Sequence, residues 1–237
     1  MDIILTENQL KYIISESLIE QRLFEVLNES VNMSTLKSKI KHAVLTGIAL
    51  STIFFAINKL NIDNAKKQNL IELAKVEADK HKKDSVFNIK VQACKKYMEF
   101  ALENKNKTLN DTKLRPETLV KCAMKMNMDL PFLMAVAHQE SCFGSTNRAL
   151  KTNSVFSVGS FDNGKNHAIY SDPNESVEPY IRLLKNDYLI NGKTIHDLLV
   201  PGNFVNNNGD RYASDKNYEK NIKYLRNLII KKFPELQ

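Results

Sequence analysis

The chain has 237 residues, of which 43% are hydrophobic and 26% are charged, and its formal net charge is +7. This composition is too apolar for an intrinsically disordered chain, and the length allows one or two globular domains with a sizeable core. All six prolines lie at or after Pro116, and six of the seven glycines lie between Gly144 and Gly209. We therefore predict a helical first half, followed by a compact domain that is richer in turns.

The basic excess lies in the middle of the chain. Residues 1–30 carry a net charge of −4, residues 31–114 a net charge of +8 and residues 115–237 a net charge of +3. A stretch of +8 is compatible with binding to nucleic acid or to an anionic membrane. Its lysines, however, are scattered along a helical pattern with few aromatic residues between them, which favours a solvated helix face. We therefore expect no nucleic-acid partner.

The three cysteines, Cys94, Cys122 and Cys142, do not provide a complete set of disulfide partners. The sequence has no CxxC pair and no Cys/His cluster with the spacing of a zinc site. We therefore expect no metal and no cofactor. The odd number of cysteines favours assembly in a reducing cytoplasm.

Residues 5–28 have the apolar spacing of one or two amphipathic helices, and Thr6 and Gln9 fit a capping box at their start. The stretch is acidic and lacks a basic n-region, so it does not have the pattern of a secretory signal. Its opening, LTENQLKYIISESL, resembles N-terminal stretches that are common in tailed-phage structural proteins.

Residues 43–57 form an uncharged apolar run flanked by lysines. Fifteen helical residues span about 22 Å, which is less than a bilayer core of about 30 Å. Three interpretations remain open: a helix buried against other protein, a short membrane-inserting segment, or an internal signal-like region. This is the one segment for which the sequence predicts possible membrane contact.

A polar break separates the two halves of the chain. Residues 60–85 are lysine-rich and predict an exposed helix or connector, and helical periodicity returns over residues 86–103. The polar segment that follows, at 103–113, is where we place the domain boundary. The sequence thus predicts a helical region over residues 1–113 and a second domain over residues 114–237.

The second domain is predicted to be mostly helical. Pro116 marks one helix start, and residues 128–144 predict a helix that is buried on most sides. Two short β-type runs between residues 153 and 171 predict a hairpin. Further helices are expected to begin near Asp172 and near Asp215.

Glu140 is the residue whose position points to chemistry. It follows an apolar stretch and lies in the last helical turn before Gly144. Apolar surroundings and the negative end of the helix dipole both disfavour the carboxylate and raise its pKa. A raised pKa suits a general acid that works near neutral pH. On helix position alone, a surface glutamate at a helix end is the favoured alternative.

Four motifs follow one another at compatible spacing: HQESCFGS (138–145), NSVFSVG (153–159), YSDPNESVEPYIRLL (170–184) and GDRYASDKNYEKNI (209–222). Together they resemble the glucosaminidase branch of the lysozyme-like superfamily. That branch has an ESxxG motif at the end of a buried helix, an NNxFGI-like strand, a tyrosine–serine turn before an ES-containing helix, and a YATDPxY-like motif. The resemblance covers roughly residues 115–230. It implies a mainly α chain whose second domain is a lysozyme-like α+β domain with a small β-hairpin lobe.

The resemblance also assigns site residues. Glu140 resembles the family's catalytic acid, and Tyr212 matches the tyrosine that lines the cleft near the scissile bond. Asn153 and Phe156 match the strand that shapes the substrate groove, and Tyr170 belongs to the tyrosine–serine turn and is a further candidate for substrate binding. Simple packing remains an equal alternative for Phe156, and a core tyrosine with a satisfied hydroxyl is the alternative for Tyr212.

The sequence departs from the family pattern after the ES pair. Cys142 and Phe143 stand where the family often has glycine and tryptophan, and the chain has no tryptophan. A second carboxylate is also missing from the motifs, and Asp162, on the predicted hairpin turn, is the best-placed candidate. If there is no second acid, the substrate's N-acetyl group or the sugar's own hydroxyl takes its place. The hydroxyl route is the lytic transglycosylase reaction.

These features predict a peptidoglycan-cleaving glycosidase with Glu140 as general acid. The helical N-terminal region favours a bacteriophage virion protein that acts at the bacterial cell wall and contacts other virion proteins through its N-terminal helices. One alternative is a bacterial cell-wall remodelling enzyme anchored in the inner membrane through residues 43–57, with a periplasmic domain. Another is a catalytically inactive virion structural or ejection protein that binds glycan.

Overall fold

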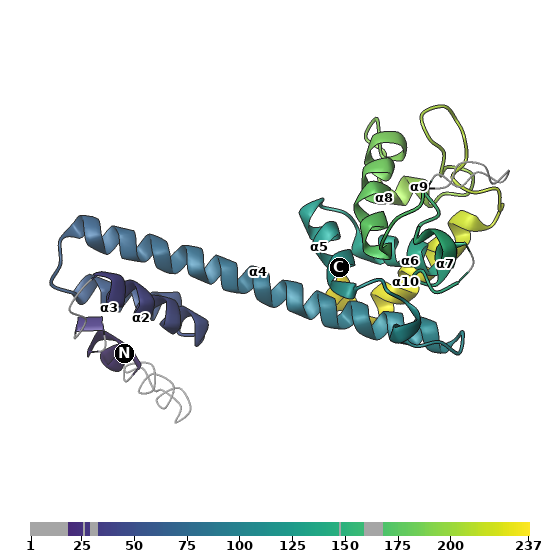
Figure 1. Cartoon of the computed structure of the whole chain (residues 1–237). Helices are drawn as coiled ribbons and strands as arrows, with labels where there is room; N and C mark the ends of the chain where they lie inside the picture. Colours follow the sequence, from purple (N-terminus) through teal and green to yellow (C-terminus); the bar gives the residue numbers. More distant parts are fainter. Residues whose placement is uncertain (1–18, 26, 29–32, 147, 159–167) are drawn as a thin grey trace, which may run out of the picture. The chain divides into compact units, whose positions relative to one another are not determined.

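The computed structural model describes residues 19–25, 27–28, 33–146, 148–158 and 168–237. The protein is mainly α-helical, as predicted from the sequence (Figure 1). It divides into two compact units, Met1–Val86 and Phe87–Gln237. The long helix α4 (Asn64–Glu103) contributes its first part to unit 1 and its last part to unit 2.

Unit 1 is a small helical unit with its own apolar core. Its helices include α2 (Met33–Leu45), α3 (Leu50–Lys59) and the start of α4. Their inward faces place leucine, isoleucine, valine and alanine side chains in one cluster: Leu36, Ile40, Ala43, Val44, Ile53, Ala56, Ile57, Leu60, Leu70 and Ala74. Leu23 and Leu27, from the described part of the first predicted helix, pack into the same cluster.

The apolar segment 43–57 does not form one helix. It begins in the last turn of α2, turns at Gly47 with φ of +81°, and continues into α3. Ile53 and Ile57 are fully buried, whereas Phe55 is 42% exposed. The segment therefore buries one face within the chain's own unit and leaves Leu45 and Phe55 exposed. In the part of the chain that the structure describes, no helix combines the length and the apolar character needed to cross a membrane.

The division between the units falls earlier than the sequence boundary at residue 113. Phe87 packs against the core of unit 2, and Val91, Cys94 and Tyr97 are buried in it. The end of α4 therefore belongs structurally to unit 2. The polar segment after it is a turn and a short 3₁₀-helix, η1 (Leu109–Asp111), which connects two parts of the same unit.

Unit 2 consists of short helices around one buried helix. After η1 they are α5 (Pro116–Lys125), α6 (Leu130–Ser141), α7 (Ala149–Thr152), η2 (Pro173–Ser176), α8 (Val177–Leu183), the π-helical turn η3 (Leu184–Tyr188), α9 (Ile195–Leu198), α10 (Tyr218–Lys232) and η4 (Pro234–Leu236). The predicted starts at Pro116 and near Asp172 are confirmed, and the last helix begins three residues after the predicted Asp215.

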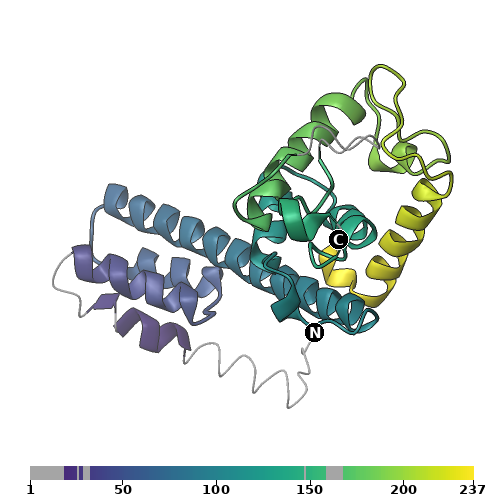
Figure 2. The same ribbon diagram turned by 45° about the vertical axis from the view of Figure 1, so that its right-hand side comes forward.

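Helix α6 is the centre of unit 2. Every side chain from Leu130 to Ala137 is buried, as its uninterrupted apolar sequence predicts. Its N-terminus is capped by Asp129, whose carboxylate accepts a hydrogen bond from the N–H of Phe132 at 2.7 Å. The helix packs mainly against α10 and also against α5 (Figures 1 and 2). Arg226 on α10 reinforces that contact with an ion pair to Asp129 at 2.6 Å.

The predicted β-hairpin over residues 153–171 is not found in the residues described on either side of its turn. Asn153 and Ser157 have φ of +53° and +54°, which interrupts an extended strand. Two backbone hydrogen bonds nevertheless join the flanks, from the N–H of Ala168 to Val158 and from the N–H of Tyr170 to Thr152. The β-type pairing in the described residues is a single antiparallel bridge, between Val205 and Arg211.

Candidate active site

The C-terminal end of α6 is held in place by Ser141. Its hydroxyl donates a hydrogen bond to the carbonyl of Val155 and accepts one from the N–H of Gly144, both at 2.7 Å. The side chain is buried, so these bonds replace water for both backbone groups. Ser141 therefore links the end of the helix to the segment that passes beside it, and it fixes the position of the preceding residue, Glu140.

The chain leaves α6 through three successive left-handed residues. Cys142, Phe143 and Gly144 have φ of +45°, +60° and +84°. This conformation is unfavourable for a bulky side chain such as Phe143, so the surrounding structure must stabilise it. The Phe143 ring is buried edge-on against Tyr97. The backbone carbonyl of Phe143 accepts a hydrogen bond from the hydroxyl of Thr112.

Glu140 opens onto a cleft of about 960 Å³. The cleft is formed by the end of α6, the start of α7, the segment at 157–158, the turn η3, the loop that the 205–211 bridge closes, the segment after that bridge and the start of α10. Its lining combines aromatic, amide and charged side chains: Tyr188, Tyr212, Tyr218, Asn206, Asn208, Asp187, Asp210, Asp215, Arg148 and Arg211. This mixture of aromatic surface and hydrogen-bonding groups suits a polar ligand with apolar faces, such as a sugar.

Two hydroxyl groups hold the Glu140 carboxyl. The hydroxyl of Tyr218, on the first residue of α10, donates a hydrogen bond to Glu140 Oε1 at 2.5 Å. Ser157 forms a second hydrogen bond to the same carboxyl. The Tyr218 ring is itself buried, so it presents its hydroxyl to Glu140 from a fixed position. The carboxyl is therefore held in a defined orientation at the edge of the cleft.

Burial raises the pKa of the Glu140 carboxyl above its usual value, and the hydrogen bonds from Tyr218 and Ser157 offset part of that rise. The pKa of the Tyr218 hydroxyl is raised well above its usual value by burial and by the charge of Glu140, so Tyr218 stays protonated and acts as the donor. The site thus favours a carboxyl that carries a proton at higher pH than a free glutamate does. That is the property expected of a general acid.

Tyr212 is among the residues that line the cleft, but its hydroxyl does not contact Glu140. It donates a hydrogen bond to the carbonyl of Phe156 at 2.8 Å, and its ring stacks on Phe204 at 4.6 Å between centroids. Its backbone N–H bonds to the carbonyl of Phe204 as well. Tyr212 therefore builds the wall of the cleft, and the neighbouring Tyr218 makes the contact with the acid.

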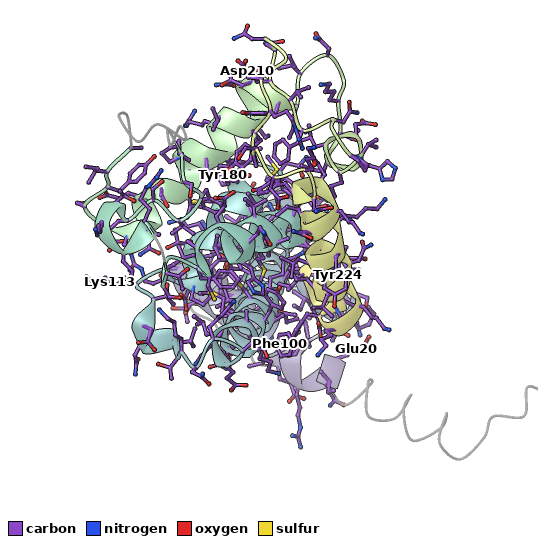
Figure 3. All side chains as sticks on the ribbon, turned by 90° about the vertical axis from the view of Figure 1, so that its right-hand side faces the viewer. Glu20, Phe100, Lys113, Tyr180, Asp210 and Tyr224 are labelled. Carbon is purple, nitrogen blue, oxygen red and sulfur yellow. The ribbon has the colours of Figure 1, made fainter. Side chains whose placement is uncertain are left out.

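The other sequence candidates lie away from the cleft or outside the described residues. Phe156 is fully buried and stacks on Tyr180 at 4.2 Å, which is a packing role (Figure 3 shows Tyr180 within the unit). The side chain of Asn153 donates a hydrogen bond to the carbonyl of Tyr170 at 2.9 Å and so fixes the two segments together. Neither Asn153 nor Tyr170 is among the lining residues. Asp162 lies outside the described residues.

The sequence reasoning missed Tyr218 and Ser157 as partners of Glu140. Tyr218 is the last tyrosine of the YASDKNY segment, and its place in the motif was the available signal. The reasoning also missed three carboxylates on the cleft, Asp187, Asp210 and Asp215. Figure 3 shows Asp210 on the outer loop of the unit. Asp187 belongs to none of the four motifs, whereas Asp210 and Asp215 lie within the GDRYASDKNYEKNI segment (209–222), which was the available signal for them.

In the part of the chain that the structure describes, no group of three or more histidine, cysteine, aspartate or glutamate side chains is arranged to hold a metal ion. Comparison with protein-family models, with curated proteins and with solved structures finds no match to this chain. The functional interpretation therefore depends on the geometry of the cleft and on the sequence motifs.

Gly144 provides a test of how tightly the end of α6 is fixed. A Cβ at this position meets Val155 Cγ2 at 3.3 Å, and the φ of +84° disfavours any other residue. We expect Gly144→Ala to lower the free energy of unfolding by about 2–3 kcal/mol in urea titrations. Gly192→Ala is the matched control, because its φ is +79° with nothing within 4 Å. Equal losses in the two variants would show that the contact with Val155 has no energetic weight.

His138 lies on the opposite side of α6 from the cleft contacts. Its Nδ1 is 2.8 Å from the hydroxyl of Tyr97, its ring stacks on Phe143, and burial lowers its pKa to about 4 from 6.5, with a smaller contribution from Lys105. The fold therefore favours the neutral ring. The stabilisation of the folded state that comes from the neutral His138 ring is complete above pH 6.5, and it is lost as the pH falls toward 4.

We expect this loss to reach about 3 kcal/mol, which urea titrations between pH 7 and pH 4 measure. His138→Gln should flatten that part of the pH dependence. His196→Gln, at an exposed position on α9, should leave it unchanged. The same pH dependence in wild type and His138→Gln would contradict the assignment.

Proposed function

We propose that unit 2 is a glycosidase that cleaves the glycan strand of bacterial peptidoglycan, with Glu140 as its general acid. The observation that carries this proposal is the Glu140 carboxyl itself. It lies at the edge of a large polar cleft, its pKa is raised by burial, and Tyr218 fixes its orientation. A carboxyl with a raised pKa in such a place suits the protonation of a glycosidic oxygen.

In the proposed reaction, Glu140 donates its proton to the bridging oxygen as the bond to the anomeric carbon breaks. Positive charge develops on the sugar ring, and a nucleophile must then bond to the anomeric carbon. Asp187, Asp210 and Asp215 are carboxylates of the cleft that are available to assist, and Asp162 remains a candidate from the sequence. Water attack gives hydrolysis. Attack by the sugar's own hydroxyl gives the anhydro product of a lytic transglycosylase.

The sequence motifs support the same proposal. All four fall within unit 2, and the ESxxG-like segment coincides with the end of the buried helix α6. The RYASDKNY segment supplies both Tyr212 and Tyr218 to the cleft. We accordingly propose that unit 2 is a lysozyme-like domain.

We further propose that the chain is a bacteriophage virion protein that acts at the cell wall during infection. The support is the N-terminal sequence LTENQLKYIISESL together with a helical unit that precedes the cleft-bearing unit. Unit 1 is then the part that contacts other virion proteins. Mass spectrometry of purified virions tests this placement. Absence of the chain from virions that infect normally would contradict it.

Zymography on purified cell walls tests the enzymatic proposal. Wild type and the control Glu117→Gln, an exposed glutamate on α5, should clear the walls equally, whereas Glu140→Gln should not. Mass spectrometry of the soluble products then names the bond, since reducing-end N-acetylglucosamine, reducing-end N-acetylmuramic acid and anhydro ends each come from a different reaction. Wall binding without clearing by wild type would favour the inactive, glycan-binding alternative.

A further inference from the structure

A buried ion pair closes the loop that carries both cleft tyrosines. Arg211 Nη2 contacts both carboxylate oxygens of Glu219, at 2.8 and 2.9 Å. The Glu219 side chain is only 1% exposed, whereas that of Arg211 is 33% exposed. A carboxylate so deeply buried is strongly destabilising unless it is paired, so the position of Arg211 is set by Glu219.

The ion pair joins the two ends of the segment that contains Tyr212 and Tyr218. Arg211 is paired with Val205 in the β-bridge, and Glu219 is the second residue of α10. The same Arg211 Nη2 lies 3.4 Å from the carbonyl of Asp215, in the middle of the segment. The segment is thus held at its start, at its midpoint and at its end.

The residue next to Glu219 contacts the acid. Tyr218 immediately precedes Glu219 on the first turn of α10, and its hydroxyl reaches Glu140 on α6. On the other side of the ion pair, Tyr212 immediately follows Arg211 and packs on Tyr218 with ring centroids 5.5 Å apart. Any movement of the ion pair therefore moves both tyrosines.

We propose that the Arg211–Glu219 ion pair is a positioning element that places the Tyr218 hydroxyl on Glu140 and so orients the acid toward the cleft. Neither charged group needs to contact the substrate in this role. The consequence for catalysis rests on the proposed function, but the placement of Tyr218 is a property of the fold and is measurable without substrate.

The test is the titration of the Glu140 side-chain carboxyl, followed by ¹³C NMR in the full-length protein. The hydrogen bond from Tyr218 lowers the Glu140 pKa, so Tyr218→Phe should move the titration midpoint upward. Glu219→Gln is the decisive variant. Loss of a nearby negative charge by itself moves the midpoint downward, whereas loss of the Tyr218 contact moves it upward.

We expect an upward movement in Glu219→Gln, and no further upward movement when the substitution is added to Tyr218→Phe. Arg211→Lys keeps the charge, so we expect it to retain more of the wild-type midpoint than Arg211→Gln does. Arg226→Gln is the matched control, because it breaks a different ion pair of α10, which joins that helix to Asp129 at the N-terminus of α6. It should lower stability and leave the midpoint unchanged.

A downward or unchanged midpoint in folded Glu219→Gln would overturn the proposal, and so would an equal upward movement in Arg226→Gln. If Glu219→Gln does not fold, the two Arg211 variants decide. Both must move the midpoint upward, and Arg211→Gln must move it further than Arg211→Lys does. Neither substitution may move the midpoint upward when it is added to Tyr218→Phe. If the midpoints move as expected but the wild-type protein cleaves no glycan, only the proposed function is contradicted. Glycan cleavage with an unchanged midpoint in every ion-pair variant would contradict only the positioning role.

Discussion

Glu140→Gln is expected to abolish glycan cleavage while making the protein more stable at pH 7. Loss of the proton donor should lower the rate by about three orders of magnitude. The gain in stability follows from burial, which raises the pKa of Glu140 in the folded state. The folded protein therefore binds this proton more tightly than the unfolded chain, and ionisation of Glu140 at neutral pH opposes folding. Glutamine keeps the shape, removes the charge and can still accept the hydrogen bond from Tyr218.

The sign of this effect gives a pH test. The stability difference between Glu140→Gln and wild type should be largest above the folded-state pKa and should shrink as the pH falls toward 4.5, the usual value for glutamate. Urea titrations at several pH values measure it. Glu117→Gln, on the surface of α5, should show no such difference. A Glu140→Gln variant that is less stable than wild type at pH 7 would contradict the assigned environment of the carboxyl.

The two cleft tyrosines are expected to separate into one that serves the acid and one that serves the fold. Tyr218→Phe removes the hydrogen bond to Glu140 and should lower the rate of glycan cleavage by about ten- to a hundredfold. Tyr212→Phe removes the bond to the buried Phe156 carbonyl. It should cost about 1–2 kcal/mol of stability and leave the rate within a few fold of wild type.

Rates on purified peptidoglycan and urea titrations of the same preparations measure both effects. Both variants remove a tyrosine hydroxyl oxygen, and the two rings pack on each other with centroids 5.5 Å apart, so each variant serves as the control for the other. If Tyr212→Phe lost more of the cleavage rate than Tyr218→Phe, Tyr212 would be the tyrosine that acts near the scissile bond. It would also contradict the role given to Tyr218.

The helices α5, α6, α8 and α10 of unit 2 were predictable because their local signals agree. Pro116 and Pro131 mark helix starts, Gly144 follows the end of α6, and the stripe through Tyr218, Ile222 and Ile229 describes the buried face of α10. Glu140 was proposed as a site residue for a similar reason. Its position at the end of an apolar helix is a local property, and the structure places it on the cleft.

The partner of Glu140 was not predictable from such patterns. The ring of Tyr218 is buried in the stripe to which its spacing assigns it, but its hydroxyl contacts a residue 78 positions earlier in the chain. Periodicity reports which face of a helix is buried and contains no information about what the far end of a side chain meets. Tyr212 and Tyr218 therefore could not be told apart before the packing of α10 on α6 was known.

The boundary between the units and the apolar segment show two further limits. Periodicity returns at residue 86, which matches the start of unit 2, but the polar segment after Glu103 was the stronger local signal. The composition of residues 43–57 is that of one continuous apolar run, and it does not show where the helix is interrupted. The turn depends on one residue, Gly47, whose φ of +81° ends α2 before α3 begins.

The most direct test of the central claim is the release of new glycan ends from purified peptidoglycan sacculi by wild type and by Glu140→Gln, measured side by side at equal folded concentration. Wild type should release new ends in proportion to time and enzyme. Glu140→Gln, although at least as stable, should release about a thousandfold fewer. Equal release by the two proteins, or no release by folded wild type, would contradict the account of Glu140 as the general acid of this cleft.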